Sequence, residues 1–414
     1  MSAEEVLVLG AGMVGVSTAL ALQQRGCQVV LLDRRPPGRE TSYGNAGFIQ
    51  REAVQPYAFP RDWASLWNVA LGRGNDVHLH WRALPALAPR LWRYWRQSAP
   101  GPYADVAAAY SRLIAHCITE HQVFIEAAGA GDLVRRDGWL QAYRVPALFE
   151  ATARAAQAVA QAHGLRCQVL DGAGLAQLEP GLKETLAGAL HWQDPWTISD
   201  PGELVERYAA LFVQRGGRIV QGDAQTLRQA GSGWAVRTDE GELQAAQAVL
   251  ALGPWAEAHT RRLGYRLPLF IKRGYHRHYT GGGTLQRPLL DTDHGVVLAP
   301  MKRGLRLTTG AEFAAQDAPA TPVQLVRAER AVERLLGLGQ PVEDTPWLGA
   351  RPCTVDMKPV IGPAPRHRGL WFHFGHGHQG FTLGPASARL LAERLCGEPP
   401  YIDPAPYDPA RFGV

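Results

Sequence analysis

The sequence predicts an α/β protein that combines a Rossmann-like nucleotide-binding domain with a second domain built on an antiparallel sheet. The first observation is an apolar run at 6–9, followed by glycines at GxGxxG spacing, a helical pattern to Gln24 and a second apolar run at 29–32. The second is the alternation of apolar and polar residues in stretches such as "WAVRTDE" and "PLFIKRGYHRHYTG", which is typical of antiparallel strands. The third is length, since 414 residues exceed what one core usually supports.

Composition and charge exclude several classes of protein. Hydrophobic residues make up 46% of the chain and charged residues 20%, which argues against disorder. The net charge of +5 is spread out without a lysine or arginine run, so we expect no nucleic-acid partner. Five cysteines stand at wide spacings without a CxxC motif, and Glu4 and Glu5 occupy the place of a signal sequence's positive segment. Both features predict reduced thiols and a cytoplasmic location.

The stretch "VLVLGAGMVGVSTALALQQRGCQVVLLDRR" is typical of a dinucleotide site. Gly10 permits the tight turn from strand to helix, Gly12 lets the backbone approach a pyrophosphate, and Gly15 lets the helix pack on the strand. Asp33 ends the second strand, 18 residues after Gly15, where a carboxylate can accept hydrogen bonds from ribose hydroxyls. Glycines can also mark a tight turn alone, but strand, glycines, helix, strand and acid in this order favour a nucleotide.

The next segment, "PPGRETSYGNAGFIQ" at 36–50, bears on which dinucleotide binds, because NAD and FAD enzymes share the glycine fingerprint. Thr41, Ser42, Asn45 and Gly47 are small or polar and would suit a loop that covers a long cofactor. A polar surface loop is an equally good interpretation of their composition.

With these segments the chain resembles the FAD-dependent D-amino acid dehydrogenases and oxidases, a superfamily that also holds glycine oxidase and sarcosine oxidase. The matching stretches span nearly the whole chain in the family's order: "GAGMVGVSTALAL", "RETSYGNAGFI", "AVLALGPWA", "GARPCTVDMKPVIG" and "GHGHQGFTLGPASARLLAERLCG". The resemblance implies a D-amino acid oxidase-like fold and FAD. We expect the FAD to be noncovalent, because Cys353 does not stand in the register of the cysteine that tethers flavin in some relatives. The expected cofactor-binding residues are Gly10, Gly12, Met13, Val14, Gly15, Asp33, Arg34, Thr41, Ser42, Asn45, Ala46, Gly47, Gly253, Trp255, Gly375, Gly377, Gln379, Gly380, Phe381 and Thr382.

The elements "RETS", "NAG", "RP" and "GHG" are most similar to the D-amino acid dehydrogenase branch, which passes electrons to a respiratory carrier. The resemblance implies hydride transfer from the substrate's α carbon to flavin, which leaves an imine. Candidate substrates are 4-hydroxy-D-proline, D-proline and D-alanine, and a quinone is the candidate acceptor. An oxygen-using flavin amine oxidase of the glycine or sarcosine oxidase type shares every motif and stays open. An RNA-modifying flavoprotein is a minor alternative, since it would need a strongly basic face.

Three residues are expected to act on the substrate. Arg351, in "GARPC", occupies the place of the family's carboxylate-binding arginine, and a guanidinium fork suits a planar carboxylate. His376, in "GHGHQGFT", is the histidine that the resemblance implies beside flavin and substrate, with the N-terminus of the following helix directed at the flavin. Tyr275 is a candidate aromatic residue of the substrate cavity, although a ladder on a solvated face explains "RGYHRHY" equally well.

The other histidines near the carboxyl end are expected to have structural roles. His373 lies on the apolar run "LWFHF" and is predicted to pack in the core, whereas His378 is predicted to be a variable neighbour of the site. The tract offers no carboxylate or cysteine at workable spacing, so we expect no metal.

The resemblance also implies that the two domains are interleaved in the sequence. Helical patterns at 145–164 and 200–217 each lead to a short strand, as in βα units of a nucleotide fold. The expected FAD-binding domain comprises residues 1–50, 146–225, 247–262 and 348–400, the substrate-binding domain 51–145, 226–246 and 263–347, and a C-terminal tail 401–414.

The segment "LHWRALPALAPRLWRYWRQSAP" at 79–100 suggests a partner, because its tryptophans and leucines fall near one helical face and its arginines nearer the other. Pro85 and Pro89 are expected to break this segment, so that only about 90–98 is regular helix. Such a helix could dock on an anionic membrane and give the protein a peripheral location on the inner face of the cell membrane. A lid over the second domain is the favoured alternative.

Overall fold

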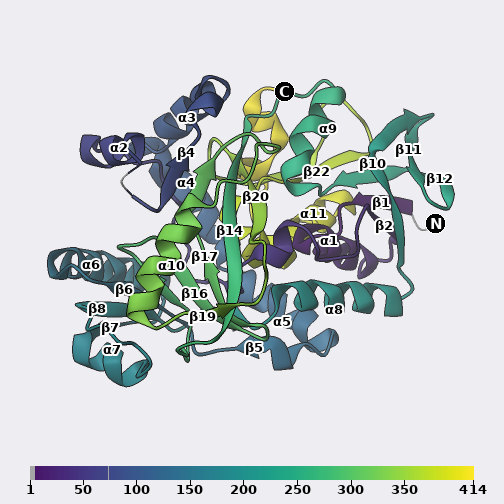
Figure 1. Cartoon of the computed structure of the whole chain (residues 1–414). Coiled ribbons are helices and arrows are strands. Elements are labelled where there is room, and N and C mark those ends of the chain that lie inside the picture. The colour runs from purple at the N-terminus through teal and green to yellow at the C-terminus, as the bar shows by residue number, and fades with distance from the viewer. Residues whose placement is uncertain (1–4, 73) are drawn as a thin grey trace.

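The computed structural model describes residues 5–72 and 74–414, which two large sheets organise (Figure 1). The first sheet has eight strands in the order β12-β11-β10-β2-β1-β13-β22-β21. Its central strands from β10 to β22 are parallel, and its outer strands are antiparallel. This arrangement confirms the predicted Rossmann-like sheet. The strands are β1 (Glu5–Leu9), β2 (Gln28–Asp33), β10 (Arg218–Ala230), β11 (Gly233–Thr238), β12 (Gly241–Ala245), β13 (Gln247–Leu250), β21 (Val360–Pro363) and β22 (Leu370–Phe374).

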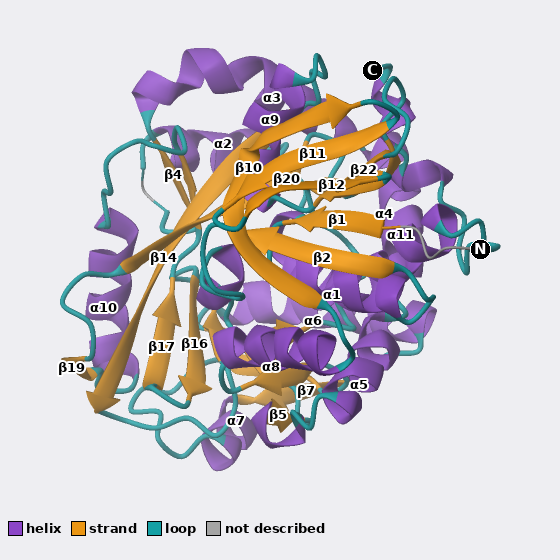
Figure 2. Cartoon of the chain, turned by 90° about the vertical axis from the view of Figure 1, so that its right-hand side faces the viewer, coloured by secondary structure: helices purple, strands orange, loops and turns teal. Residues whose placement is uncertain are grey.

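Three helices cover one face of this sheet, namely α1 (Met13–Gln23), α8 (Pro201–Gln214) and α11 (Gly380–Leu395) (Figure 2). Alternate residues of β1 divide between the two faces, so that Val6 and Val8 pack in the core with these helices while Leu7 and Leu9 join the core on the opposite face. Helix α8 begins after Asp200, whose side chain caps it by accepting a hydrogen bond of 3.0 Å from the amide of Glu203.

The second sheet has eleven strands and is organised by the long strand β14 (Leu269–Gly281). Strand β14 pairs antiparallel with β20 (Trp347–Thr354) along its first half and with β17 (Gly304–Thr308) along its second. In Figure 1, β14 lies between helix α10 (Val323–Leu335) and the nucleotide-binding sheet. The other strands are β4 (Val77–Leu79), β6 (Trp139–Tyr143), β7 (Cys167–Asp171), β8 (Gly188–Trp192), β15 (Leu289–Asp291), β16 (Val296–Met301), β18 (Ala311–Phe313) and β19 (Gly339–Pro341).

Two predicted strands lie in a different sheet from the one expected. Helix α6 (Pro146–His163) does connect two parallel strands, β6 and β7, but these flank β8 in the eleven-stranded sheet. Strand β11, the stretch "WAVRT", forms a hairpin with β10 and therefore extends the nucleotide-binding sheet instead of the second one. The sheets thus divide differently from the predicted domains at 146–192 and 226–246, and the rest of the domain division stays a prediction.

The remaining elements connect the two sheets. Within the described ranges, no helix has the length and apolar character needed to cross a bilayer. A small sheet consists of β3 (Phe48–Ile49), β9 (Trp196–Ile198) and β5 (Val134–Arg135), and the other helices are α2 (Trp63–Ala70), α3 (Leu84–Gln97), α4 (Pro100–Ile114), α5 (Cys117–Ala127), α7 (Gly172–Leu178) and α9 (Ala256–Arg262).

Helix α3 is longer than predicted. Pro85 stands in its first turn, where a missing N–H is tolerated, and Pro89 is accommodated inside the helix. The buried side chains Leu87 and Tyr94 hold the helix against the second sheet, and this packing outweighs the hydrogen bond lost at Pro89. The predicted break is therefore wrong.

A buried ion pair fixes one face of β14. Arg273 and Glu312 are 1% and 0% exposed at their side chains and lie 2.7 Å apart. Glu312 also accepts hydrogen bonds from Tyr275, Thr321 and His80. Burial alone would raise the pKa of Glu312, but the bonds from Thr321, His80 and Arg273 hold it below its usual value, so the carboxylate is charged.

Replacing Glu312 by Leu would leave the Arg273 charge buried without its partner. We expect the free energy of unfolding to fall by about 3–5 kcal/mol, measured by denaturant titration. The double variant Arg273→Met, Glu312→Leu should be less destabilised than Glu312→Leu, because it removes the charge with its partner. An equal loss from Glu242→Leu, whose partner Arg228 is 57% exposed, would contradict this explanation.

Candidate functional site

A cavity of about 740 Å³ begins at the carboxyl ends of β1 and β2 and extends between the two sheets. It is lined by the glycine loop, the loop at 40–46, the segment 373–381, strands β14 and β20, and the inner sides of α2 and α3. Ligands of open parallel sheets bind at the carboxyl ends of the strands, so the cavity lies where a nucleotide is expected.

The glycine loop has the close packing that its sequence predicts. Gly10 has a φ of +107°, and a Cβ there would lie 2.5 Å from the carbonyl oxygen of Ala251. A Cβ on Gly15 would lie 1.7 Å from the oxygen of Gly10, so only glycine lets α1 approach the loop. Gly15 packs the helix and does not itself line the cavity.

The start of α1 is open to an anion. A Cβ on Gly12 would meet nothing closer than the Ser42 hydroxyl at 3.2 Å, and the first turn of α1 contains no acidic residue. The free N–H groups and the positive end of the helix dipole favour a pyrophosphate there. Ser42 accepts a hydrogen bond of 2.9 Å from the amide of Met13, which brings the loop at 40–46 over the helix start.

The end of the cavity beside β2 fits a ribose and a base. Asp33 accepts a 2.6 Å hydrogen bond from the amide of Ala11, which orients its carboxylate toward the glycine loop. The guanidinium of Arg34 lies 4.4 Å from the ring centroid of Trp255, and both residues line the cavity together with Gly253.

The loop after β2 is tied to the second sheet. The Thr41 hydroxyl donates a 3.1 Å hydrogen bond to the carbonyl of Ala350 in β20, and the Asn45 side chain accepts one of 2.7 Å from the amide of Gly47. Gly47 has a φ of +79° and faces the oxygen of Ile198, so it shapes the loop without lining the cavity. These contacts favour the predicted cofactor-covering loop over a free surface loop.

The histidines of "FHFGHGHQG" have different surroundings. His373 is fully buried between Thr18 (2.7 Å) and Ser387 (2.8 Å), as predicted. His376 lies at the cavity wall, but its Nε2 is bonded to Ser387 at 3.0 Å, and burial lowers its pKa to about 3. This ring is therefore neutral near pH 7 and held by α11 through Nε2, and the catalytic role expected for His376 stays a prediction. His378 also lines the cavity, with its ring 5.1 Å from that of Tyr57.

Helix α11 directs its N-terminus at the cavity. Gly375, Gly377, Gly380 and Phe381 line the wall where this helix begins, and its first turn contains no acidic residue. The dipole there can stabilise negative charge on a bound ring. Two expected contacts lie just outside: Gln379 borders a smaller neighbouring cavity, and the Thr382 hydroxyl donates to the carbonyl of Phe48 at 3.2 Å.

Arg351 lies in the wall of the cavity between the two sheets. A Cβ on Gly274 would lie 2.6 Å from its guanidinium nitrogens, so the glycine makes room for the group. The guanidinium donates weakly to the carbonyls of Arg273 and Gly310, both at 3.3 Å. No described carboxylate lies within 4 Å of it, and burial lowers its pKa. A charged fork without an internal partner can bind a carboxylate ligand.

Tyr275 does not reach the cavity, so its predicted place there is wrong. Its side chain is 2% exposed, packs in the core beneath α10, and bonds through its hydroxyl to Glu312. Successive residues of a strand face opposite sides, and in β14 the residues that line the cavity are Lys272 and Gly274. The sequence does not indicate Lys272, Tyr57 and Tyr94 as cavity residues, because the alternation in β14 does not show which face of the strand meets the cavity.

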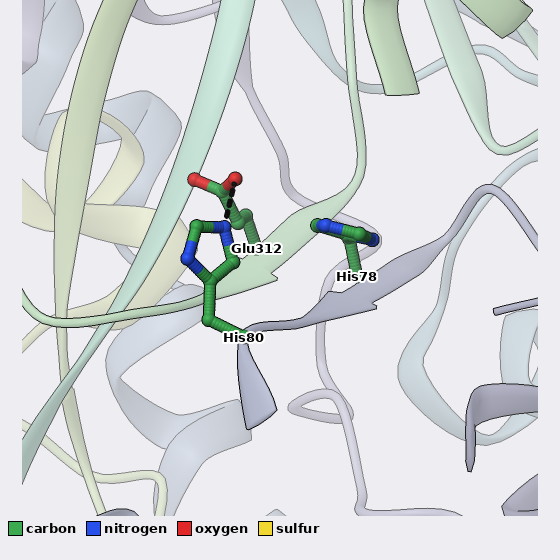
Figure 3. A group of neighbouring side chains, drawn as sticks. All are labelled: His78, His80 and Glu312. Atoms are coloured by element: carbon green, nitrogen blue, oxygen red, sulfur yellow. Dashed lines mark hydrogen bonds and ion pairs between the residues drawn. The ribbon is translucent and has the colours of Figure 1, made fainter. Parts of the chain in front are cut away.

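A second cluster could be mistaken for a metal site. His78, His80 and Glu312 bring their ligand atoms within 4.8 Å of one another (Figure 3). Both oxygens of Glu312 already accept hydrogen bonds, including one from the Arg273 cation, and His80 bonds to the Thr321 hydroxyl at 2.8 Å. The cluster is satisfied as a hydrogen-bonded network, and a cation would meet the charge of Arg273.

Replacing Gly12 by Val would fill the approach to the α1 N-terminus. We expect the affinity for FAD, the dinucleotide implied by the sequence, to fall about 100-fold or more while far-UV circular dichroism is unchanged. Flavin absorbance after reconstitution measures it. Gly101→Ala, at a position with no atom within 4 Å of the added Cβ, is the matched control. Full flavin content in Gly12→Val would contradict the assignment.

Comparison with known proteins agrees with this geometry. The chain is 31% identical to a D-amino acid dehydrogenase from Granulibacter bethesdensis, over 98% of this chain and 99% of the relative. It is 29% identical to a D-amino-acid oxidase from Bradyrhizobium diazoefficiens, over 98% of each. Glycine oxidase from Geobacillus kaustophilus shares the fold with a TM-score of 0.72 at 21% identity over 98% of each chain. L-proline dehydrogenase from P. horikoshii does so with a TM-score of 0.73 at 17% identity, over 99% of this chain and 98% of that one.

A family model described as FAD dependent oxidoreductase matches residues 5–394. The predicted fold class and the predicted FAD are thereby confirmed. The chain belongs to the FAD dependent oxidoreductase family.

Proposed function

We propose that this enzyme oxidises a D-amino acid or cyclic imino acid to the imine and passes the electrons to a membrane quinone. The observation that carries the proposal is Arg351, a guanidinium in the cavity wall with no described carboxylate within 4 Å, beside the wall formed by 373–381. The relatives named D-amino acid dehydrogenase and D-amino-acid oxidase support the substrate class. D-Proline, 4-hydroxy-D-proline and D-alanine are the neutral candidates.

The residues at this end suit oxidation at an α carbon. FAD, held by the glycine loop and the segment 373–381, would supply a hydride acceptor for the α C–H bond, while the substrate's nitrogen lone pair would form the C=N bond. Arg351 would hold the carboxylate by paired hydrogen bonds and so fix the direction of the C–H bond. The amine must be neutral for this step. The positive charges of Arg351 and Lys272 favour loss of its proton, because like charges disfavour the ammonium form.

His378 fits the same chemistry as a neutral side chain. Burial, with the charges of Arg351 and Lys272, holds the pKa of His378 well below its usual value. A neutral imidazole beside the substrate can accept a hydrogen bond from the amine without adding a positive charge. Water then hydrolyses an open-chain imine after release.

An exposed aromatic patch supports a membrane acceptor. The tryptophans Trp63 and Trp67 on α2 are 85% and 65% exposed, and Trp92 on α3 is 56% exposed. The arginines at 61, 82, 93 and 96, which lie in these helices or just before them in the sequence, are also exposed, a combination that suits an anionic lipid surface. Helices α2 and α3 also line the cavity, with Leu66, Val69, Ala70, Leu84 and Leu91. An apolar acceptor could therefore pass from the patch to the flavin, whereas α3 also covers the cavity as the lid alternative expects.

Replacing Arg351 by Met should lower kcat/KM about 30- to 1,000-fold, mainly through a higher KM, because the carboxylate loses its charged partner. Anaerobic flavin reduction by D-amino acids measures this. Flavin content should stay at the wild-type level. Arg351→Lys keeps the charge without the fork and should fall between the two proteins. An unchanged kcat/KM in Arg351→Met would remove the assigned role.

The variant Trp63→Ser, Trp67→Ser should bind anionic lipid vesicles about tenfold or more weakly, because it removes apolar area from the patch. Vesicle sedimentation and quinone reduction in membranes measure the effect. Val326→Ser, at a position of α10 that is 43% exposed, is the control. Rapid oxygen consumption without quinone reduction would instead support the oxidase alternative.

A further inference from the structure

A second buried cation stands next to Arg351. In the ladder of β14 and β20, Lys272 lies directly opposite Arg351, so both side chains leave the same face of the sheet and both line the cavity. Lys272 is 7% exposed. Its position therefore belongs to the substrate end of the cavity and not to the protein surface.

The ammonium of Lys272 has aromatic neighbours in place of a counter-ion. Its Nζ lies 4.6 Å from the ring centroid of Tyr94, 5.6 Å from that of Phe270 and 5.7 Å from that of Phe313. The only hydrogen bond that described residues make with it is to the Tyr94 hydroxyl, at 3.1 Å. An ammonium has three donors, and a buried ammonium without an anion is costly.

Neighbouring groups that could ionise do not supply the missing charge. Burial raises the pKa of the Cys353 thiol and of the Tyr94 phenol, so both stay protonated near pH 7. His378 is neutral, as described above. No described carboxylate lies within 4 Å of Lys272, whereas Arg273, one residue along the strand, is paired with Glu312.

The head groups of Lys272 and Arg351 have different neighbours in β14. The guanidinium of Arg351 lies over Gly274, and the ammonium of Lys272 lies beside Phe270. Gly274 and Phe270 lie four positions apart on β14, which separates their α carbons by about 13 Å. One carboxylate would not hold both groups well, but two carboxylates on one small molecule would.

We propose that the substrate is an amino dicarboxylate, with Arg351 binding the α-carboxylate and Lys272 binding an acidic side chain of about glutamate length. This inference rests on the proposed function, because it assigns the second anion to the D-amino acid oxidised there. Two charge-assisted contacts would also fix the α carbon more firmly than one, because they define the direction of the whole side chain.

The first test is binding alone. Spectral titration of the FAD-loaded enzyme with glutarate and with valerate, which have the same number of carbons, should give a Kd about tenfold or more lower for glutarate. In Lys272→Met the preference should disappear, and in Lys272→Arg it should largely return. Lys302→Met is the matched control, since Lys302 is 42% exposed and pairs with Glu203. It should keep the wild-type preference.

The second test is turnover. The ratio of kcat/KM for D-glutamate over D-glutamine should be about tenfold or more in the wild type and fall to about one in Lys272→Met. Comparing D-aspartate and D-2-aminoadipate, whose side chains are one carbon shorter and one carbon longer than that of D-glutamate, measures which distance between the two carboxylates the site prefers. Equal binding of glutarate and valerate by the wild type would overturn the inference, while flavin reduction by neutral D-amino acids would leave the proposed function standing. A glutarate preference lost in Lys272→Met, without flavin reduction by any D-amino acid, would retain the anion site and reject the D-amino acid assignment.

Discussion

The pairing of β14 with β20 is the contact on which the site depends. It sets Lys272 opposite Arg351 and places Gly274 beneath the guanidinium. Strand β20 also contacts the segments expected to hold the cofactor. Cys353 forms an isolated β-bridge with His376, and the carbonyl of Ala350 accepts the hydrogen bond from Thr41. A shift of register by one residue would turn Lys272 away from the cavity and bring Arg273 into it.

The two faces of β14 treat charge differently. On the face toward α10, Arg273 is neutralised by Glu312, and the tyrosine and histidine around them complete the hydrogen bonds. On the cavity face, Lys272 has an aromatic surrounding and one hydroxyl. On the first face, the buried charge of Arg273 is stabilised by a carboxylate of the protein itself. On the second face the partner must come from outside, which is the electrostatic condition for a binding site.

The features that could be predicted from the sequence are those fixed by local geometry. The glycine loop depends on contacts within one turn, such as that of Gly15 with Gly10, and Asp200 caps a helix three residues away. Arg351 and the flavin loop followed from resemblance. Tyr275 and Lys272 lie on opposite faces of β14, because successive residues of a strand alternate. Which face meets the cavity is decided by the pairing of β14 with β20, a strand that lies far away in the sequence. Helix α6 is a second example, because the sequence pattern of a strand–helix–strand crossover does not show which of the two sheets its strands join.

The substrate end and the wall formed by α2 and α3 belong to one cavity, which bears on the order of events under the proposed function. A dicarboxylate bound to Arg351 and Lys272 would be largely stripped of water. An apolar acceptor beside it would remove the remaining hydration without supplying any hydrogen bond. Once the product has left, the neutral ring of a quinone acceptor would make no ion pair with Arg351 or Lys272, but it could pack against the apolar side chains of Leu84 and Leu91. Substrate and acceptor are therefore expected to use the cavity in turn, with the imine leaving before the acceptor enters.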